Sequence, residues 1–193
     1  INGDVVVELD EMLNVLLSNI AAAGREDAIT FVDATGMVTI ENDDSATVSI
    51  EESRSITEGD AGQSNATLTV TLSAPVDVNV LTDADSADGT ATEAGTLVSD
   101  NDYDTVDETL TFSNATGAAL TLTVDVPVNG DGVVELDEAM KLLLSNLVAT
   151  GVLGDRDVSF GNTTAEVNIL NDDSATVTIN DITINEETGS ATL

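Results

Sequence analysis

The chain has 193 residues, of which 37 are acidic and 4 are basic, and its formal net charge is −33 at pH 7. This charge excludes a nucleic-acid-binding surface and disfavours anionic membranes, so cations are the natural partners. Cysteine and histidine are both absent, which excludes disulfides, thiolate zinc sites and cysteine nucleophiles. No run of residues approaches the ~20 apolar residues of a membrane span. Hydrophobic residues nevertheless make up 41% of the chain, so we expect it to fold around a core.

Two segments of the sequence occur twice. Residues 2–19, NGDVVVELDEMLNVLLSN, return at 129–146 as NGDGVVELDEAMKLLLSN, an offset of 127 (129 − 2). The segment NDDSATV at 42–48 returns at 171–177, an offset of 129 (171 − 42). A period of this length is that of a domain. We therefore expect an excerpt of a longer tandem array, divided into the C-terminal part of one repeat at 1–44, a complete repeat at 45–173 and the beginning of the next at 174–193.

Taken in chain order, apolar residues alternate with threonine, serine or acidic residues. This period of two, with many β-branched side chains, is typical of half-buried antiparallel strands. Seven short strands separated by turn residues predict an all-β, immunoglobulin-like Greek-key β-sandwich. The region Thr82–Glu108 is expected to be a long loop. The predicted strands are Ala46–Ile50, Ala66–Ser73, Val76–Val80, Thr109–Phe112, Leu120–Val126, Glu138–Leu147 and Ala165–Ile169.

The segment Glu138–Leu147 is ambiguous, because it is rich in leucine, methionine and lysine and propensity alone would make it a helix. The duplicated segment resolves the ambiguity. Apolar residues occupy every second position in both copies. They are Leu13, Val15 and Leu17 in the first copy and Met140, Leu142 and Leu144 in the second. A strand fits this period better than a helix does.

The acidic residues of 45–173 concentrate between the predicted strands. Loops that are distant in sequence gather at the two ends of a Greek-key sandwich, so several carboxylates are expected to converge. Two carboxylates ~4 Å apart repel by roughly 4 kcal/mol at an effective dielectric near 20, and a cation would relieve this repulsion. Calcium suits such loops because it takes 6–8 oxygen ligands in flexible geometry, whereas magnesium demands a stricter octahedron. Zinc is disfavoured without cysteine or histidine.

The order of these motifs resembles the Calx-beta domain. The resemblance covers all of 45–173 and, through the repeats, both flanks. It is carried by Ile56-Thr-Glu58-Gly, Asp88-Gly-Thr-Ala91, Asp102-Tyr103, Thr109-Leu-Thr-Phe112, Asp131-x3-Glu135-x-Asp137-Glu138 leading to Leu144-Ser-Asn146, and Asn171-Asp-Asp173. Members of this family occur in sodium/calcium exchangers, in an integrin tail and in tandem arrays of bacterial surface proteins. The resemblance implies a seven-stranded sandwich that binds calcium at one tip, near the junction with the next domain.

Carried over by position, the resemblance also implies a ligand set. The ligands of the complete repeat would be Glu58, Asp102, Asp131, Glu135, Asp172 and Asp173, with Asp4, Glu8, Asp43 and Asp44 serving the preceding repeat and Glu186 the following one. The chain departs from the family pattern at Gly130-Asp131, where calcium-sensing members carry consecutive acids, and at Asn171, which softens an acidic triplet. Fewer charges imply fewer ions or weaker affinity. Extra residues at about 96–101 precede Asp102.

The acidic motifs and the sequons also have simpler interpretations. Any single acidic pair is more typical of solvated surface than of a ligand, and only the recurrence of the whole set favours metal binding. The EF-hand pattern fails, because taking Gly130 as its glycine places Leu136 where glutamate is required. Three sequons begin at Asn65, Asn114 and Asn162, but a chain rich in asparagine and threonine produces them by chance.

Three classes of function remain open. The favoured one is a calcium-rigidified structural repeat of a large extracellular, cell-surface or adhesin-type protein, acting as a spacer or filament module. Its partners would be calcium ions, neighbouring repeats and other copies, since an exposed edge strand permits association. The alternative is a regulatory calcium-sensor domain linked to a membrane transporter. An enzyme is disfavoured, because a glycosidase with paired carboxylates would also need a sugar-stacking platform, and the chain has one tyrosine, three phenylalanines and no tryptophan.

Overall fold

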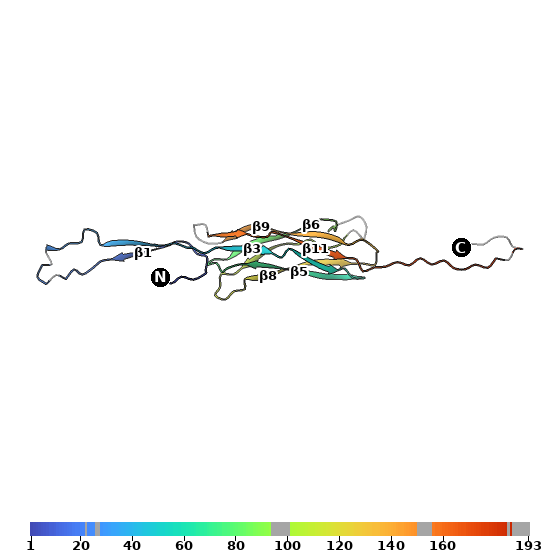
Figure 1. Ribbon diagram of the computed structural model, residues 1–193, viewed down its shortest axis with the longest axis horizontal. Coiled ribbons are helices and arrows are strands. Elements are labelled where there is room, and N and C mark those ends of the chain that lie inside the picture. Colours follow the sequence, from blue (N-terminus) through green and yellow to red (C-terminus); the bar gives the residue numbers. More distant parts are fainter. Residues whose placement is uncertain (22, 26–27, 94–100, 150–155, 185, 187–193) are drawn as a thin grey trace.

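A β-sandwich forms the centre of an elongated molecule, with a β-hairpin extending from one end and the C-terminal tail from the other (Figure 1). This computed structural model describes residues 1–21, 23–25, 28–93, 101–149, 156–184 and 186. Its described part contains no helix long and apolar enough to cross a membrane. The immunoglobulin-like all-β fold expected from the alternating pattern is confirmed.

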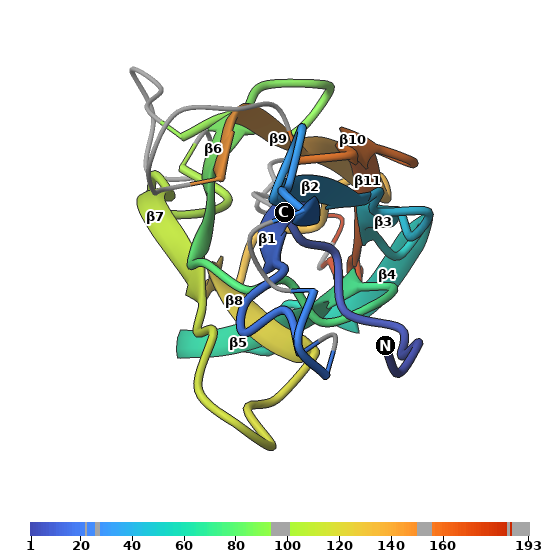
Figure 2. The same cartoon turned by 90° about the vertical axis from the view of Figure 1, so that its left-hand side faces the viewer.

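Two packed sheets make up the sandwich, and a separate two-stranded sheet forms the hairpin. One sheet has the order β10-β3-β5-β8, the other β4-β11-β9-β6-β7, and the hairpin pairs β1 with β2. Viewed along the long axis, β5 and β8 lie in one layer and β6 and β9 in the other (Figure 2). The strands are β1 (Glu11–Leu16), β2 (Thr35–Ile40), β3 (Ala46–Ile50), β4 (Ser53–Thr57), β5 (Gly62–Leu72), β6 (Val80–Ala87), β7 (Asp107–Phe112), β8 (Thr121–Gly130), β9 (Glu138–Ala149), β10 (Val158–Phe160) and β11 (Thr164–Leu170).

The alternating residues of the strands meet in one core between the two sheets. In β5 the side chains of Leu68, Val70 and Leu72 are buried while the intervening threonines face outward or are half-buried. The strand β9 confirms the interpretation of Glu138–Leu147, since it buries Met140 and every second residue to Leu144. Burying a large aliphatic side chain stabilises a fold by about 1.5–3 kcal/mol, so this core holds the sandwich together.

The chain changes sheets in two adjacent segments, once between β3 and β4 and once between β10 and β11. The first edge segment is split into β3, in the four-stranded sheet, and β4, in the five-stranded sheet, and β10 and β11 divide in the same way. As a result β4 pairs with β11 in parallel and β10 pairs with β3 in parallel. The expectation that all strands are antiparallel is therefore wrong for these two pairs.

The hairpin has no core of its own. Among the described residues of 1–44, only Val7 is buried. Every residue of β1 is exposed, although its counterpart β9 is a central strand of the sandwich. The division into repeats at 44 and 173 stays a prediction.

Two further expectations from the sequence are wrong. The segment Val76–Val80 is not a strand: Val76 forms an isolated bridge with Val7, and β6 begins only at Val80. Pro75 precedes this bridge and has no N–H to donate to a ladder. The expected loop Thr82–Glu108 contains most of β6 and the start of β7. Its strand character was hidden because the acidic residues of β6 lie on the outer face, where Asp83 accepts hydrogen bonds from β7 and β9.

Candidate metal centre

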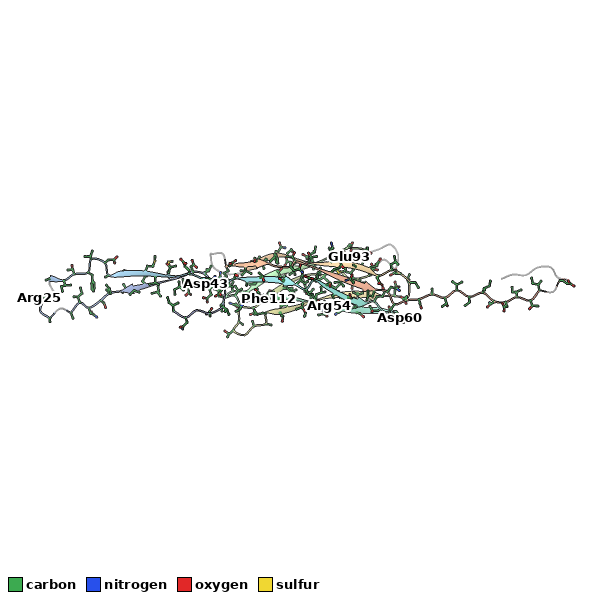
Figure 3. All side chains as sticks on the ribbon, viewed as in Figure 1. Arg25, Asp43, Arg54, Asp60, Glu93 and Phe112 are labelled. Carbon is green, nitrogen blue, oxygen red and sulfur yellow. The ribbon has the colours of Figure 1, made fainter. Side chains whose placement is uncertain are left out.

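Three carboxylates meet at the end of the sandwich that is marked by Asp60 in Figure 3. One carboxylate oxygen from each of Glu58, Asp172 and Asp173 lies within 4.8 Å of the other two. The pairing of β4 with β11 explains why Glu58 meets two residues that lie 114 (172 − 58) and 115 (173 − 58) positions later in the sequence. The two strands are parallel and end side by side, and the amide of Glu58 donates to Leu170 O at 3.2 Å, so the acids that follow both strands reach the same edge.

The loop between β8 and β9 brings two more acids to this edge. Asp131 Oδ1 accepts a hydrogen bond of 2.7 Å from the amide of Val133. The amide of Glu135 donates to Asn171 Oδ1 at 3.0 Å, and the amide of Asn171 in turn donates to Asp137 Oδ1 at 3.1 Å. These bonds tie the loop to the end of β11 and keep its two carboxylates near Glu58.

The Glu58 carboxylate is buried among other carboxylates, and one of its oxygens has no hydrogen-bond partner. Its Oε1 atom is buried and has no hydrogen-bond partner, and Asp173 Oδ2 is in the same state. Burial first, and then repulsion from four nearby carboxylates, raises the pKa of Glu58 to about 7. Burial, followed by repulsion from Asp60 and other acids, also raises the pKa of Asp173. A buried carboxylate oxygen without a partner is costly, so the site favours a proton or a cation at this position. The four carboxylates acting on Glu58 are Glu135, Asp131, Asp173 and Asp172.

A sixth predicted ligand lies on the inner side of the group. Asp102 is 6% exposed, and its Oδ2 accepts a hydrogen bond of 2.6 Å from the amide of Thr92. Glu138, at the start of β9, faces it. Burial, a hydrogen bond with Asp102 and repulsion from Asp102, Glu135 and Glu58 raise the pKa of Glu138. Asp102 therefore joins the group through Glu138. The extra residues before Asp102, from 96 to 100, lie outside the described residues.

Glu138 is the residue that sequence reasoning missed. It stood in the quoted motif, but the assignment of β9 as a strand placed it among structural residues. A signal was present, because Glu138 is the counterpart of Glu11 in the duplicated segment. Glu11 likewise raises the pKa of its neighbour Glu8 in the other acidic group.

The remaining predicted ligands lie elsewhere. Asp4, Glu8, Asp43 and Asp44 are at the other end of the sandwich, which Asp43 marks in Figure 3. They line a cavity of ≈ 180 Å³ together with Glu11. Burial first, followed by repulsion from Asp4, Glu11, Asp77 and Asp44, raises the pKa of Glu8. Glu186 is exposed in the C-terminal tail and belongs to neither group.

The duplicated loops have the same internal hydrogen bonds. The amide of Glu8 donates to Asn42 Oδ1 at 3.1 Å, as the amide of Glu135 does to Asn171. The amide of Asn42 donates to Asp10 Oδ1 at 2.9 Å, and its side-chain amide donates to Asp44 O at 2.9 Å, which matches Asn171 Nδ2 to Asp173 O at 3.1 Å. The repeated sequence thus builds the same acidic loop twice.

The donor set fits a hard cation. Every charged group near Glu58 is a carboxylate, and neither of the ion pairs found among the described residues involves this group, since they are Arg54–Glu51 and Arg156–Asp77. Oxygen-only donors on loops match calcium, and the two buried oxygens without partners offer direct ligand positions. The residues present therefore fit a calcium ion held by Glu58, Asp172 and Asp173, with Asp131 and Glu135 within reach.

The protein is thus an all-β, immunoglobulin-like sandwich with a group of carboxylates at one end that could bind calcium. Residues 41–183 match the Calx-beta domain family, and the chain belongs to this family. No curated protein sequence matches the chain.

Solved structures show the same fold. The apo form of the Calx CBD1 domain has a TM-score of 0.53 and 21% identity, and the match covers 67% of this chain and 100% of that one. The calcium binding domain CBD12 of CALX1.1 has a TM-score of 0.51 and 21% identity over 67% of this chain and 47% of that one. CBD12 from CALX1.2 has a TM-score of 0.51 and 23% identity over 66% of this chain and 44% of that one. This chain thus spans less than half of both CBD12 structures.

Proposed function

We propose that the chain binds calcium at the group formed by Glu58, Asp131, Glu135, Asp172 and Asp173, and that the bound ion stiffens a structural repeat. The observation that carries the proposal is the pair of buried oxygens without partners, Glu58 Oε1 and Asp173 Oδ2, inside a group of converging carboxylates. Calcium supplies the positive charge that this oxygen-only site lacks. Membership of the Calx-beta family and the likeness to a structure described as a calcium binding domain support the same conclusion.

We further propose that the repeat is a spacer of an extracellular surface protein and has no catalytic role. Support comes from the duplicated acidic loops, which lie at opposite ends of an elongated sandwich (Figure 3). An ion at each end would hold the loops through which successive repeats connect. The absence of cysteine and the strongly acidic composition suit an extracellular protein stapled by ions.

The test is thermal unfolding of the full chain in millimolar calcium, in EDTA and in magnesium. A ligand at ~100 times its dissociation constant adds about 2.7 kcal/mol, which should raise the unfolding midpoint by about 5–10 °C for a chain of this size. The double variant Asp172→Asn with Asp173→Asn should lose this rise. Its matched control is Asp107→Asn with Glu108→Gln, which removes the same charge from exposed positions of β7 and should keep the rise.

An equal response to magnesium, or no response, would show that the acidic group is solvated surface. A regulatory sensor related to the CBD12 structures is the second candidate, favoured by the shared fold. Small-angle X-ray scattering separates the two roles. In calcium a stiffened spacer should lose flexibility and become as long or longer, whereas a sensor should switch between two shapes of similar flexibility.

A further inference from the structure

The N-terminal acidic loop is docked onto the sandwich through a single valine. The amide of Val7 donates to Pro75 O at 2.9 Å, and the amide of Asp77 donates to Val7 O at 3.1 Å. Val7 and Val76 thereby form a parallel bridge, and their exposed fractions are 0% and 4%. The loop Pro75–Asp77 therefore acts as an acceptor for the acidic loop of the preceding unit.

The equivalent loop at the opposite end of the sandwich, residues 131–137, has the same hydrogen bonds, but no such docking contact is found among the residues that the structure describes. Val134 stands at the position of Val7. In both loops a valine amide donates to an Asp Oδ1 atom and a glutamate amide donates to an Asn Oδ1 atom. Val134 is 50% exposed, and its neighbour Leu136 is 83% exposed whereas the equivalent Leu9 is half-buried. One loop conformation is thus docked at one end of the sandwich and open at the other.

The acceptor loop Pro75–Asp77 carries an ion pair that reduces its repulsion of an acidic loop. Arg156 is nearly buried and forms two hydrogen bonds to the Asp77 carboxylate, so the charge of Asp77 is compensated before an acidic loop approaches. Beside the bridge, Val6 and Leu120 line a cavity of ≈ 440 Å³. The acceptor surface therefore combines an apolar pocket with a carboxylate that is paired with an arginine.

The connection between units is too short to let them separate far. Only Ser45 stands between Asp44, at the end of the acidic group, and the first residue of β3. Ser174 follows Asp173 in the same way. A copy of the unit attached after Asp173 would begin its first strand beside the open loop, with its acceptor loop within reach of Val134.

We propose that the loop Asp131–Asp137 docks onto the Pro75–Asp77 loop of a second copy of this unit, with Val134 taking the place of Val7. This contact goes beyond calcium binding, because the docked N-terminal loop makes it through backbone hydrogen bonds and a buried valine. Through this contact each unit binds the unit that follows it. The relative orientation of two neighbouring units in a tandem array is therefore fixed.

The experiment uses an extended chain in which residues 1–173 are followed by residues 45–193, so that the present chain is retained and one unit is duplicated. Cysteine is absent from the sequence, so engineered pairs form disulfides without competition, and a disulfide requires closely placed Cα atoms. The test pair is Val134→Cys in the first copy with Val76→Cys in the second. The positive control is Val7→Cys with Val76→Cys in the first copy. The negative control pairs Val134→Cys with Thr67→Cys, an exposed position of β5 in the second copy.

Disulfide formation is followed by mass spectrometry of unreduced digests, in calcium and in EDTA. We expect the test pair to form within about twofold of the rate of the positive control and at least about tenfold faster than the negative control, as two docked groups have a high effective concentration. A test pair no faster than the negative control in both conditions would overturn the proposal. Crosslinking without any calcium effect on unfolding would support docking and reject the calcium proposal, so the two failures are distinguishable.

A second variant avoids cysteine chemistry. Val134→Asp should lower the unfolding midpoint of the extended chain and leave that of the present chain unchanged, because Val134 is half exposed when no second copy follows. An equal effect on both chains would overturn the proposal.

Discussion

The two acidic loops are built from nearly the same residues and the same hydrogen bonds, yet their surroundings differ. At the far end, Glu58 supplies a buried oxygen without a partner and the group Glu58, Asp172 and Asp173 converges. At the end marked by Asp43, Glu8 is repelled by Asp77, a residue of the segment between β5 and β6. The comparison teaches that the repeated sequence determines the conformation of the loop, while the neighbouring strand or unit determines its charge environment and its burial.

The largest contrast between copies is expected in the strands that follow the loops. Met140 in β9 is 0% exposed, whereas its counterpart Leu13 in β1 is 40% exposed. Met140→Ala should lower the free energy of unfolding by about 2–5 kcal/mol, and Leu13→Ala by less than about 0.5 kcal/mol. Urea unfolding of the full chain measures both, and similar losses would contradict the claim that only the second copy belongs to a core.

The acidic group at Glu58 should give the next largest effect, through pH. Its pKa is raised from 4.5 in the unfolded chain to about 7 in the folded one, so the stability it contributes is complete below pH 4.5 and is lost as the pH rises through about 7. In EDTA the free energy of unfolding should fall across this interval by on the order of 2 kcal/mol. Urea unfolding at several pH values measures the slope.

Two comparisons check this pH prediction. Glu58→Gln should flatten the slope in EDTA, and the same substitution at Glu108, exposed in β7, should not. Saturating calcium should reverse the slope, because protons and calcium compete for the same carboxylates. A slope that persists in the Glu58→Gln variant would assign it to other groups.

A smaller effect is expected from the docking valine. Val7→Ala removes buried methyl groups worth about 1.5 kcal/mol, whereas Val134→Ala changes a half-exposed side chain and should cost under about 0.5 kcal/mol. Because loosening of the loop need not unfold the sandwich, hydrogen exchange is the suitable measurement. The amides of Val7 and Asp77 should lose protection in the Val7→Ala variant, and unchanged protection would show that the valine does not hold the loop.

The smallest effect is expected from the ion pair on the outer surface. Arg54 bonds to Glu51 with 42% and 27% of their side chains exposed, so Arg54→Ala should cost at most about 1 kcal/mol. Neither the calcium response nor the exchange of the Val7 amide should change. A shift in either measurement would mean that the two ends of the sandwich are coupled through β4.

The alternating pattern predicted most of the strands, because half-buried threonine and valine runs such as β5 and β11 have a period of two. It failed where that pattern is weak. The strand β4 is exposed at four of its five positions, and the acidic outer face of β6 has the composition of a loop. The site was predicted through the family resemblance, and its residues converge because β4 and β11 run in parallel. That pairing, and the inward position of Glu138, depend on long-range register that a single sequence does not contain.

The exchange of sheets by the paired segments β3–β4 and β10–β11 also determines how the sandwich would carry mechanical load. The chain enters at β3 and leaves after β11, at opposite ends of the long axis (Figure 1). In the proposed tandem array, tension along this axis would thus pull β4 and β11 lengthwise in opposite directions. Their parallel ladder has five paired positions, which would be strained together in shear rather than opened one at a time. The parallel pairing of β4 with β11 would therefore resist this force.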